Sequence, residues 1–241
     1  EAIEHNPVVY ELSTEITWMQ DAPDLQKWIT DYARARYGKL PAGAEQGWKV
    51  LLETVYGSKA GRLPSTESVM CARPALTIQK VAANGDLSRP YSTVRLWDAV
   101  DHFLQASNDL KKSDTYRYDL VDVMRQCLSD LSLPLQKQIT EAYLAEDNEK
   151  LQQAGEQFLA LIDDFDRLLG TRSTFLLGKW IKEARQWGTT EEEKDLYEWN
   201  ARTLVTVWGP NHSSAHLFEY SNRQWASLMK GYYKPRWEKF I

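Results

Sequence analysis

The segment LQQAGEQFLALIDDFDRLLG, residues 151–170, decides the fold class of this chain. Its apolar residues recur three or four positions apart: Leu151, Ala154, Phe158, Leu161, Ile162, Phe165, Leu168 and Leu169. This spacing is typical of an amphipathic helix, and Gly170 occupies a position at which helices commonly end. The segment therefore predicts one long helix that packs an apolar face against other elements.

The same helical spacing recurs along most of the chain, in both directions from this segment. The further segments that carry it are residues 8–19, 25–36, 48–56, 94–104, 118–131, 175–187, 196–207 and 215–233. Asp24 and Gly38 stand where the caps of a helix are expected, and Thr190 with Glu193 has capping-box spacing. No segment has a convincing strand pattern. The sequence therefore predicts a mainly α fold, an irregular multi-helix bundle.

Glycine and proline interrupt this helical pattern. Residues 57–90 contain several of both and predict a long connection, which in compact domains often carries function. Pro134 predicts a break or a kink after the helical segment 118–131, and Pro235 predicts the end of the last helix.

The composition is that of a globular, mildly acidic protein. The 241 residues include 29 Lys and Arg against 34 Asp and Glu, for a net charge of −5, and 43% are hydrophobic. A phosphate-binding surface normally carries a basic excess, so this balance argues against a nucleic-acid partner. No apolar run reaches the roughly 18 residues of a membrane span. The 10 Trp and 12 Tyr suit either a protein that handles sugars or one that packs bulky helices.

The residue types that bind metals or attack substrates give no decisive pattern. His212 and His216 are four residues apart, but no third ligand accompanies them, so no metal site is predicted. Cys71 and Cys127 are too few for a cysteine zinc site or a disulfide framework, and no activating base is recognisable beside Cys71. Spacing singles out none of the carboxylates that could be catalytic near the start, Glu1, Glu4 and Glu15.

Trp208 stands out among the aromatic residues. Most of the others, Trp18 and Trp48 among them, occupy core positions of the helical pattern and are expected to pack. Trp208 instead lies between a helix end and Gly209-Pro210, where its side chain either projects toward a partner or closes the core.

Short sequence blocks, considered together, cover nearly the whole chain. The first block is EAIEHNPVVYEL, residues 1–12, which continues to Glu15 and Trp18. The later blocks are Arg36-Tyr37-Gly38, Trp48 with Leu51-Leu52, Arg73-Pro74, Arg117-Tyr118-Asp119-Leu120, Phe175-Leu176-Leu177-Gly178 with Trp180, Trp208-Gly209-Pro210, Tyr220-Ser221-Asn222, Tyr232-Tyr233 and Pro235-Arg236-Trp237. Each block alone is weak. Together they resemble the α-N-acetylglucosaminidases, glycoside hydrolase family 89.

The resemblance implies a fold and a place for this chain within it. Members of that family consist of a small N-terminal domain, a (β/α)8 TIM barrel and a large α-helical C-terminal domain. Residues 1–6 would then be the end of the catalytic barrel. Residues 7–241 would be the helical C-terminal domain, which packs on a TIM-barrel domain absent from this chain. The family implies a secreted, periplasmic or lysosomal location.

The resemblance also implies an activity: retaining, exo-acting hydrolysis of terminal α-linked N-acetylglucosamine (GlcNAc) from glycans or glycosaminoglycans, without a cofactor. Glu1 aligns with the catalytic nucleophile, and the acid/base carboxyl belongs to the barrel, so the isolated chain is expected to be inactive. Ala2 stands where the family usually has Gly, and His5 where Gln is common. Trp208 and Tyr220 are candidates for lining the sugar pocket, or alternatively for packing the interface between barrel and helices.

A second hypothesis is of a different class, a non-catalytic helical interaction module or carbohydrate-binding module. It predicts a polar, self-contained surface. The enzyme hypothesis predicts instead an apolar face around the N-terminal helix and the Trp208 loop, where a barrel would dock.

Overall fold

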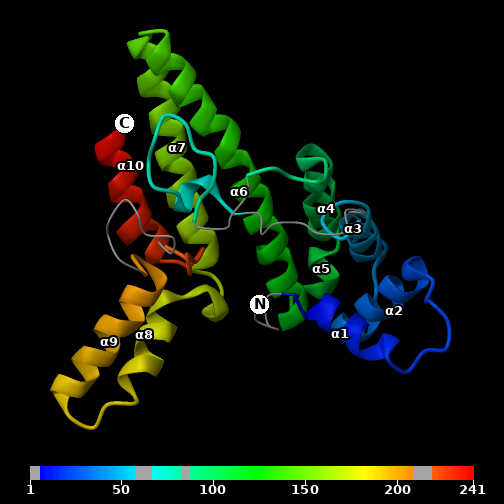
Figure 1. Ribbon diagram of the computed structural model, residues 1–241. Helices are drawn as coiled ribbons and strands as arrows, with labels where there is room; N and C mark the ends of the chain where they lie inside the picture. Colours follow the sequence, from blue (N-terminus) through cyan, green and yellow to red (C-terminus); the bar gives the residue numbers. More distant parts are fainter. Residues whose placement is uncertain (1–5, 58–66, 83–86, 209–218) are drawn as a thin grey trace. The chain divides into compact units, whose positions relative to one another are not determined.

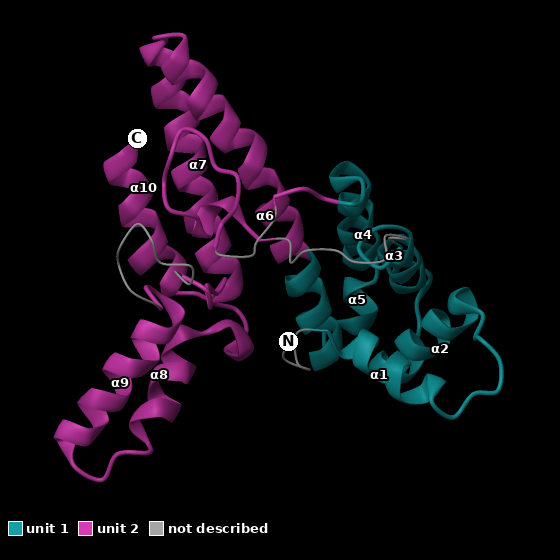
Figure 2. Cartoon of the chain, viewed as in Figure 1, with its two compact units in different colours: residues 1–59, 90–123 teal, residues 60–89, 124–241 magenta. Residues whose placement is uncertain are grey.

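The computed structural model describes residues 6–57, 67–82, 87–208 and 219–241. In this part of the chain the secondary structure is helical, apart from one isolated parallel bridge between Leu176 and Ala226 (Figure 1). The chain divides into two compact units, residues 1–59 with 90–123 and residues 60–89 with 124–241 (Figure 2). The predicted mainly α fold is confirmed.

Unit 1 consists of short helices and the first part of a long one. They are α1 (Pro7–Ile16), α2 (Leu25–Tyr37), α3 (Ala42–Glu53), α4 (Thr93–Gln105), α5 (Ser107–Leu110) and α6 (Asp114–Leu144), which continues into unit 2. α3 packs against both α2 and α4. Gly47 lets α3 and α4 approach closely, because a Cβ at this position would lie 3.1 Å from the Phe103 ring. The ring of Trp48 meets Phe103 edge to face in the same core.

α2 begins and ends where the sequence predicts. The side chain of Asp24 accepts hydrogen bonds from the backbone N–H groups of Gln26 and Lys27, which have no partner within the helix. Gly38 ends the helix with a φ of +75°, a left-handed conformation that costs glycine little. Local side-chain chemistry therefore sets both ends of α2.

Unit 2 contains the rest of α6 and the C-terminal part of the chain. Its other elements are α7 (Asn148–Leu169), α8 (Leu177–Arg185), α9 (Glu191–Val205) and α10 (Lys234–Phe240), with the short segments η2 (Val69–Cys71), η3 (Ser173–Phe175) and η4 (Met229–Tyr233). α7 is the helix predicted from residues 151–170, and most of its apolar residues are buried. Phe158 of α7 and Trp237 of α10 are fully buried, with ring centroids 4.6 Å apart.

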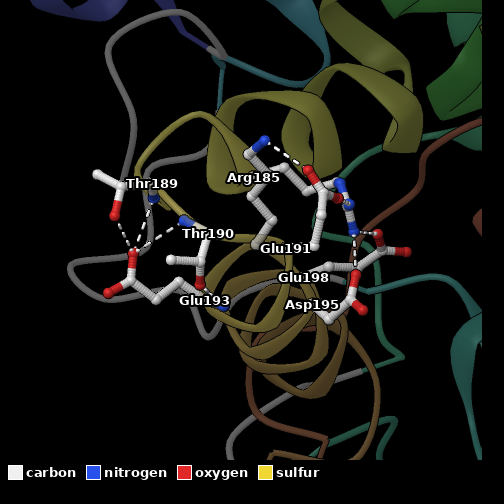
Figure 3. Close-up of polar contacts among 8 residues, drawn as sticks. Arg185, Thr189, Thr190, Glu191, Glu193, Asp195 and Glu198 are labelled. Atoms are coloured by element: carbon white, nitrogen blue, oxygen red, sulfur yellow. Dashed lines mark hydrogen bonds and ion pairs between the residues drawn. The ribbon is translucent and has the colours of Figure 1, made fainter.

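α8 and α9 form a hairpin whose turn is held by polar contacts (Figure 3). The predicted capping box is present: Thr190 Oγ1 accepts from the N–H of Glu193, and the Glu193 carboxylate accepts from the N–H of Thr190. The guanidinium of Arg185, at the end of α8, makes ion pairs with three carboxylates of α9, those of Glu191, Asp195 and Glu198.

At two prolines the helix end predicted from the sequence is absent, whereas the alternative of a kink at Pro134 stays a prediction. α6 runs through Pro134 to Leu144, so the predicted break does not occur; the many remaining bonds of this long helix outweigh one missing N–H. The last helix does not cover residues 215–233, because residues 219–227 are not helical. Helical structure resumes before η4 and passes through Pro235, the second residue of α10, where a missing N–H is tolerated.

Candidate functional site

Trp208 and Tyr220, the two predicted pocket residues, lie against each other and are called the aromatic pair below. Their ring centroids are 5.7 Å apart and their planes form an angle of 70°, an edge-to-face contact. Tyr220 is 47% exposed, and Trp208 is half-buried. The structure thus joins the two residues and leaves aromatic surface accessible to a ligand.

Neither member of the aromatic pair belongs to a helix. Trp208 follows α9, and its backbone N–H donates to the carbonyl of Thr203 at 3.0 Å. Tyr220 follows Glu219, whose N–H donates to the carbonyl of Val207 with an N···O distance of 3.5 Å. A backbone contact therefore joins the residue before Trp208 to the residue before Tyr220.

Glu219 is a buried carboxylate directly beside the aromatic pair. It is 3% exposed, and its φ of +47° lies in the left-handed region that non-glycine residues rarely adopt. Its Oε1 accepts from Nε of Arg73 at 2.8 Å, and its Oε2 accepts from Nη1 of Arg236 at 3.1 Å. The two guanidinium groups compensate a charge that would be costly to bury alone. We call Glu219, Arg73 and Arg236 the arginine clamp.

The arginine clamp joins the segment of Glu219 to two others. Nη2 of Arg236 also donates to the carbonyl of Ala72 at 3.3 Å, and its guanidinium lies 4.9 Å from the centre of the Tyr232 ring. Trp237, the next residue, donates from Nε1 to the carbonyl of Met70 at 3.0 Å. α10 and residues 70–73 therefore form a fixed base beneath Glu219.

Glu67 is bound to the same part of unit 2. Nδ2 of Asn222 donates to Oε1 of Glu67 at 3.1 Å, whereas the buried Oε2 has no hydrogen-bond partner among the described atoms. Burial raises the pKa of Glu67 above its usual range, and the hydrogen bond from Asn222 opposes the rise. This carboxyl group therefore keeps its proton to a higher pH than an exposed one does.

The arginine clamp is the part of this site that sequence analysis missed. Tyr220, Arg73 and Arg236 all belong to the blocks that carry the family resemblance. The missing information is their pairing, since Arg73 and Glu219 are 146 positions apart. Glu219 itself is adjacent to a block, and that position was the available signal.

Several other candidates from the sequence are not placed at this site. Glu1, the predicted nucleophile, lies outside the described residues, as do His212 and His216. Among the described residues no group of three or more His, Cys, Asp or Glu side chains could hold a metal ion. Cys71 is fully buried, and burial raises the pKa of its thiol, so it packs in the core and is not a nucleophile.

Unit 1 exposes apolar side chains around the N-terminal helix, as one part of the enzyme hypothesis predicts; the loop after Trp208, the other part, lies outside the described residues. These exposed residues are Val9 and Ile16 of α1, Trp18 and Met19 of the turn after it, and Leu25, the first residue of α2. The expectation that Trp18 packs is wrong: it is 89% exposed, because α1 ends at Ile16 and Trp18 lies in the turn beyond it. Trp48 is buried as predicted. Exposed apolar side chains, where they adjoin one another, are typical of a surface that another protein surface covers.

The helices of the structure carry no membrane span: none that is described is both long and apolar enough to cross a bilayer.

Comparisons with known proteins agree with one another. Residues 28–241 match the family model described as "Alpha-N-acetylglucosaminidase (NAGLU) C-terminal domain". Human alpha-N-acetylglucosaminidase is 34% identical over 244 residues, which cover 100% of this chain and 32% of that protein.

Solved structures of a family 89 glycoside hydrolase from Clostridium perfringens are similar to this chain, with a TM-score of 0.93 and 34% sequence identity. One, in complex with 2-acetamido-1,2-dideoxynojirmycin, covers 98% of this chain. Another, a double variant in complex with its substrate GlcNAc-alpha-1,4-galactose, covers 97%. In both cases the match takes up 27% of the solved chain, so this chain corresponds to a minor part of each relative.

Proposed function

Since the chain belongs to the family of alpha-N-acetylglucosaminidase C-terminal domains, we propose that it is the helical part of a retaining, exo-acting α-N-acetylglucosaminidase. The full-length glycosidase would remove terminal α-linked GlcNAc from glycans or glycosaminoglycans. Residues 1–6 would complete its catalytic TIM barrel, and residues 7–241 would form the helical domain.

One observation carries this proposal. A relative that binds GlcNAc-alpha-1,4-galactose as its substrate shares the fold of 97% of this chain, at 34% identity. The aromatic pair supplies a local feature of the kind such a substrate needs, because the C–H faces of a sugar ring pack on aromatic planes while polar groups bind its hydroxyls. Trp208 and Tyr220 would thus contribute one wall of the pocket.

In this proposal Glu1 is the nucleophile. Its ionised carboxylate attacks the anomeric carbon and forms a covalent glycosyl-enzyme, while a carboxylic acid of the barrel protonates the leaving oxygen. The same barrel group then takes a proton from the water that opens the intermediate, and the two inversions leave the anomeric configuration retained. Such a mechanism places the two carboxyl groups about 5–5.5 Å apart.

The TIM-barrel domain of the same protein is the proposed partner of the helical domain. The exposed apolar side chains of α1 and of the turn after it offer a surface for that partner. Burial of apolar surface contributes roughly 25 cal/mol per Å², so even a modest contact at Trp18 would be stabilising. As in the family, the enzyme would act in a secreted, periplasmic or lysosomal setting.

Hydrolysis of an aryl α-N-acetylglucosaminide by the full-length protein tests the proposal. We expect retention of configuration in the wild type. Glu1→Gln should lower kcat at least about a thousandfold, because no other group replaces a covalent nucleophile. Glu4→Gln is the matched control, since it removes a carboxylate from the same segment and should keep its activity. Azide should restore turnover to Glu1→Gly and give the glycosyl azide of opposite configuration.

Three results would contradict parts of the proposal. Full activity of Glu1→Gln would remove Glu1 from its role. Turnover by the isolated chain of 241 residues would refute the need for a carboxyl group from the barrel. A full-length protein that binds GlcNAc-terminated glycans without hydrolysing them would favour the non-catalytic carbohydrate-binding module.

A further inference from the structure

Neither member of the aromatic pair is held in place by a helix. Trp208 lies beyond the end of α9, and Tyr220 lies in the non-helical stretch 219–227. Binding a sugar against an aromatic plane is favourable only if the plane is already oriented, because side chains that become ordered on binding reduce the affinity.

Glu219 has the contacts expected of a support for the aromatic pair. Both of its carboxylate oxygens are occupied, at 2.8 Å by Arg73 and at 3.1 Å by Arg236, and these charge-assisted bonds are the stronger kind. Its left-handed backbone is a strained conformation, which persists only where the surroundings enforce it. That strain at the residue before Tyr220 indicates that the position of Tyr220 is imposed by the clamp.

The base of the clamp is fixed independently of the aromatic pair. Arg236 donates to the carbonyl of Ala72, and its neighbour Trp237 donates to the carbonyl of Met70. Glu219 in turn contacts Val207, the residue before Trp208, through its own N–H. The contacts therefore run from a buried core to the Glu219 carboxylate, and from the Glu219 backbone to Tyr220, its neighbour, and to Val207, the neighbour of Trp208.

We infer that Glu219 is a positioning residue for sugar binding, whose carboxylate, held by Arg73 and Arg236, fixes Tyr220 against Trp208. This inference rests on the proposed function, in which the aromatic pair lines the pocket. It assigns Glu219 no contact with the sugar. The two arginines differ in a way that makes a test possible: the Arg236 side chain is 20% exposed, whereas the Arg73 side chain is 47% exposed. Arg73 can therefore be replaced without opening the core.

The test compares Arg73→Gln and Glu219→Gln in the full-length enzyme, with Arg117→Gln as the matched control. Arg117 pairs with Asp114 in unit 1 and has a similarly exposed side chain, at 51%. We expect KM to rise about five- to tenfold in both clamp variants, the size of one aromatic contact, with kcat nearly unchanged. Arg117→Gln should change neither. Arg73→Lys keeps the cation and should restore part of the lost affinity.

A second measurement reads the aromatic pair directly. With 5-fluorotryptophan incorporated, the fluorine resonance of Trp208 is identified by its loss in Trp208→Phe. We expect this resonance to shift or broaden in Arg73→Gln and Glu219→Gln and to stay in place in Arg117→Gln. Circular dichroism checks that each variant keeps its helices. A role limited to stability would leave the Trp208 resonance of the folded variants where it is.

The outcomes separate the inference from the proposal beneath it. An unchanged Trp208 resonance in both clamp variants would overturn the inference, whatever the kinetics. A shifted resonance with an unchanged KM would also overturn it, since the pair would then not bind the sugar. Absence of hydrolysis by the wild type would refute the proposed function instead, and the fluorine spectra would still report whether the clamp holds the pair.

Discussion

Each unit of the molecule buries a carboxylate against arginine, but the two carboxylates are set in different surroundings. Asp119 of α6 in unit 1 is 5% exposed and Glu219 in unit 2 is 3% exposed. Nε and Nη2 of Arg36 donate to the two oxygens of Asp119 at 2.7 and 2.8 Å. The Tyr37 hydroxyl donates to Asp119 at 2.7 Å and accepts from Nε1 of Trp48 at 2.8 Å.

The Asp119 network is closed within a helical core. Its members come from α2, α3 and α6, and the side chains of Asp119, Tyr37 and Trp48 bond to one another or to Arg36. Burial raises the pKa of Asp119, against the donors on Arg36 and Tyr37, because the carboxylate is almost wholly removed from water. A buried ion pair adds little net stability over apolar packing, yet losing one partner is costly. The network therefore specifies how these helices pack.

The arginine clamp is open by comparison. Its two arginines come from separate segments, the Arg73 side chain reaches solvent, and Glu219 adjoins a ring that is itself half exposed. The difference shows that a buried carboxylate–arginine pair can have two structural roles. The Asp119 ion pair is enclosed among helices and fixes their packing. The Glu219 ion pairs are open to solvent on one side and orient the aromatic pair beside them.

Asp119→Asn should give the largest effect and so test the enclosed case. Arg36 would stay buried without its counter-charge, and the free energy of unfolding should fall by about 3–5 kcal/mol. Urea unfolding of variant and wild type measures the change. Asp114→Asn, which removes the partner of Arg117 in an exposed pair, is the control and should cost less than about 1 kcal/mol. Equal losses of unfolding free energy in Asp119→Asn and Asp114→Asn would show that enclosing the Asp119 ion pair has no special effect on stability.

Glu219→Gln should destabilise less and act on KM more. Arg73 stays hydrated when the Glu219 carboxylate is lost, because its side chain is partly exposed. We therefore expect a fall of about 1–3 kcal/mol in the free energy of unfolding. KM should rise in this variant and not in a folded Asp119→Asn enzyme. Urea unfolding and steady-state kinetics on both variants give the two numbers for each. If both variants lose the same unfolding free energy and change KM by the same factor, the clamp and the Asp119 network have the same role.

Tyr37→Phe sharpens the picture of the closed network. It removes one hydrogen bond to Asp119 and leaves Nε1 of Trp48 buried without an acceptor, so the loss should lie near the upper end of about 0.5–1.5 kcal/mol. Tyr143→Phe in α6 is the control, because Tyr143 is 54% exposed and its hydroxyl remains hydrated. Urea unfolding that finds no difference between these variants would show that the network closes without Tyr37.

Glu193→Gln should give the smallest effect, and one that depends on pH. Bonds from the hydroxyl and N–H of Thr189, then from the N–H of Thr190, hold the pKa of Glu193 below its usual 4.5 (Figure 3). A lowered folded pKa gives stability that is present above the ordinary value and lost as pH falls through the lowered one. The variant should therefore lower Tm more at about pH 7 than near pH 3. Thermal unfolding at both pH values decides, and an equal shift at the two would contradict a role of the charge.

Helix ends were the most predictable part of this fold. Helix caps act within one helical turn, so they can be predicted from neighbouring residues, as they were for Asp24, Gly38 and the pair Thr190 and Glu193. The prediction of a helix over residues 215–233 was wrong because the contacts that decide the conformation there are long-range. The spacing of this segment alone fits a helix, but long-range contacts of Glu219 impose another backbone conformation on the part that the structure describes.

The candidate site could be predicted in its residues and not in its connections. Trp208 and Tyr220 followed from a helix end and from the family resemblance, whereas their mutual contact needed the fold. The clamp could not be predicted, because nothing local to Arg73 or Arg236 identifies Glu219 as their shared partner. Ion pairs between distant segments depend on which backbones meet, and that is a property of the whole unit.

The position of Arg236 and Trp237 in α10 also has a consequence for truncated variants. A truncation just before residue 236 would leave α7 in place and still delete both side chains. The truncated protein would lack the ring that packs on Phe158 and one of the two cations that hold Glu219. Truncation at this point should therefore lower the stability of unit 2 by much more than the loss of an exposed chain end would, because it opens a buried core.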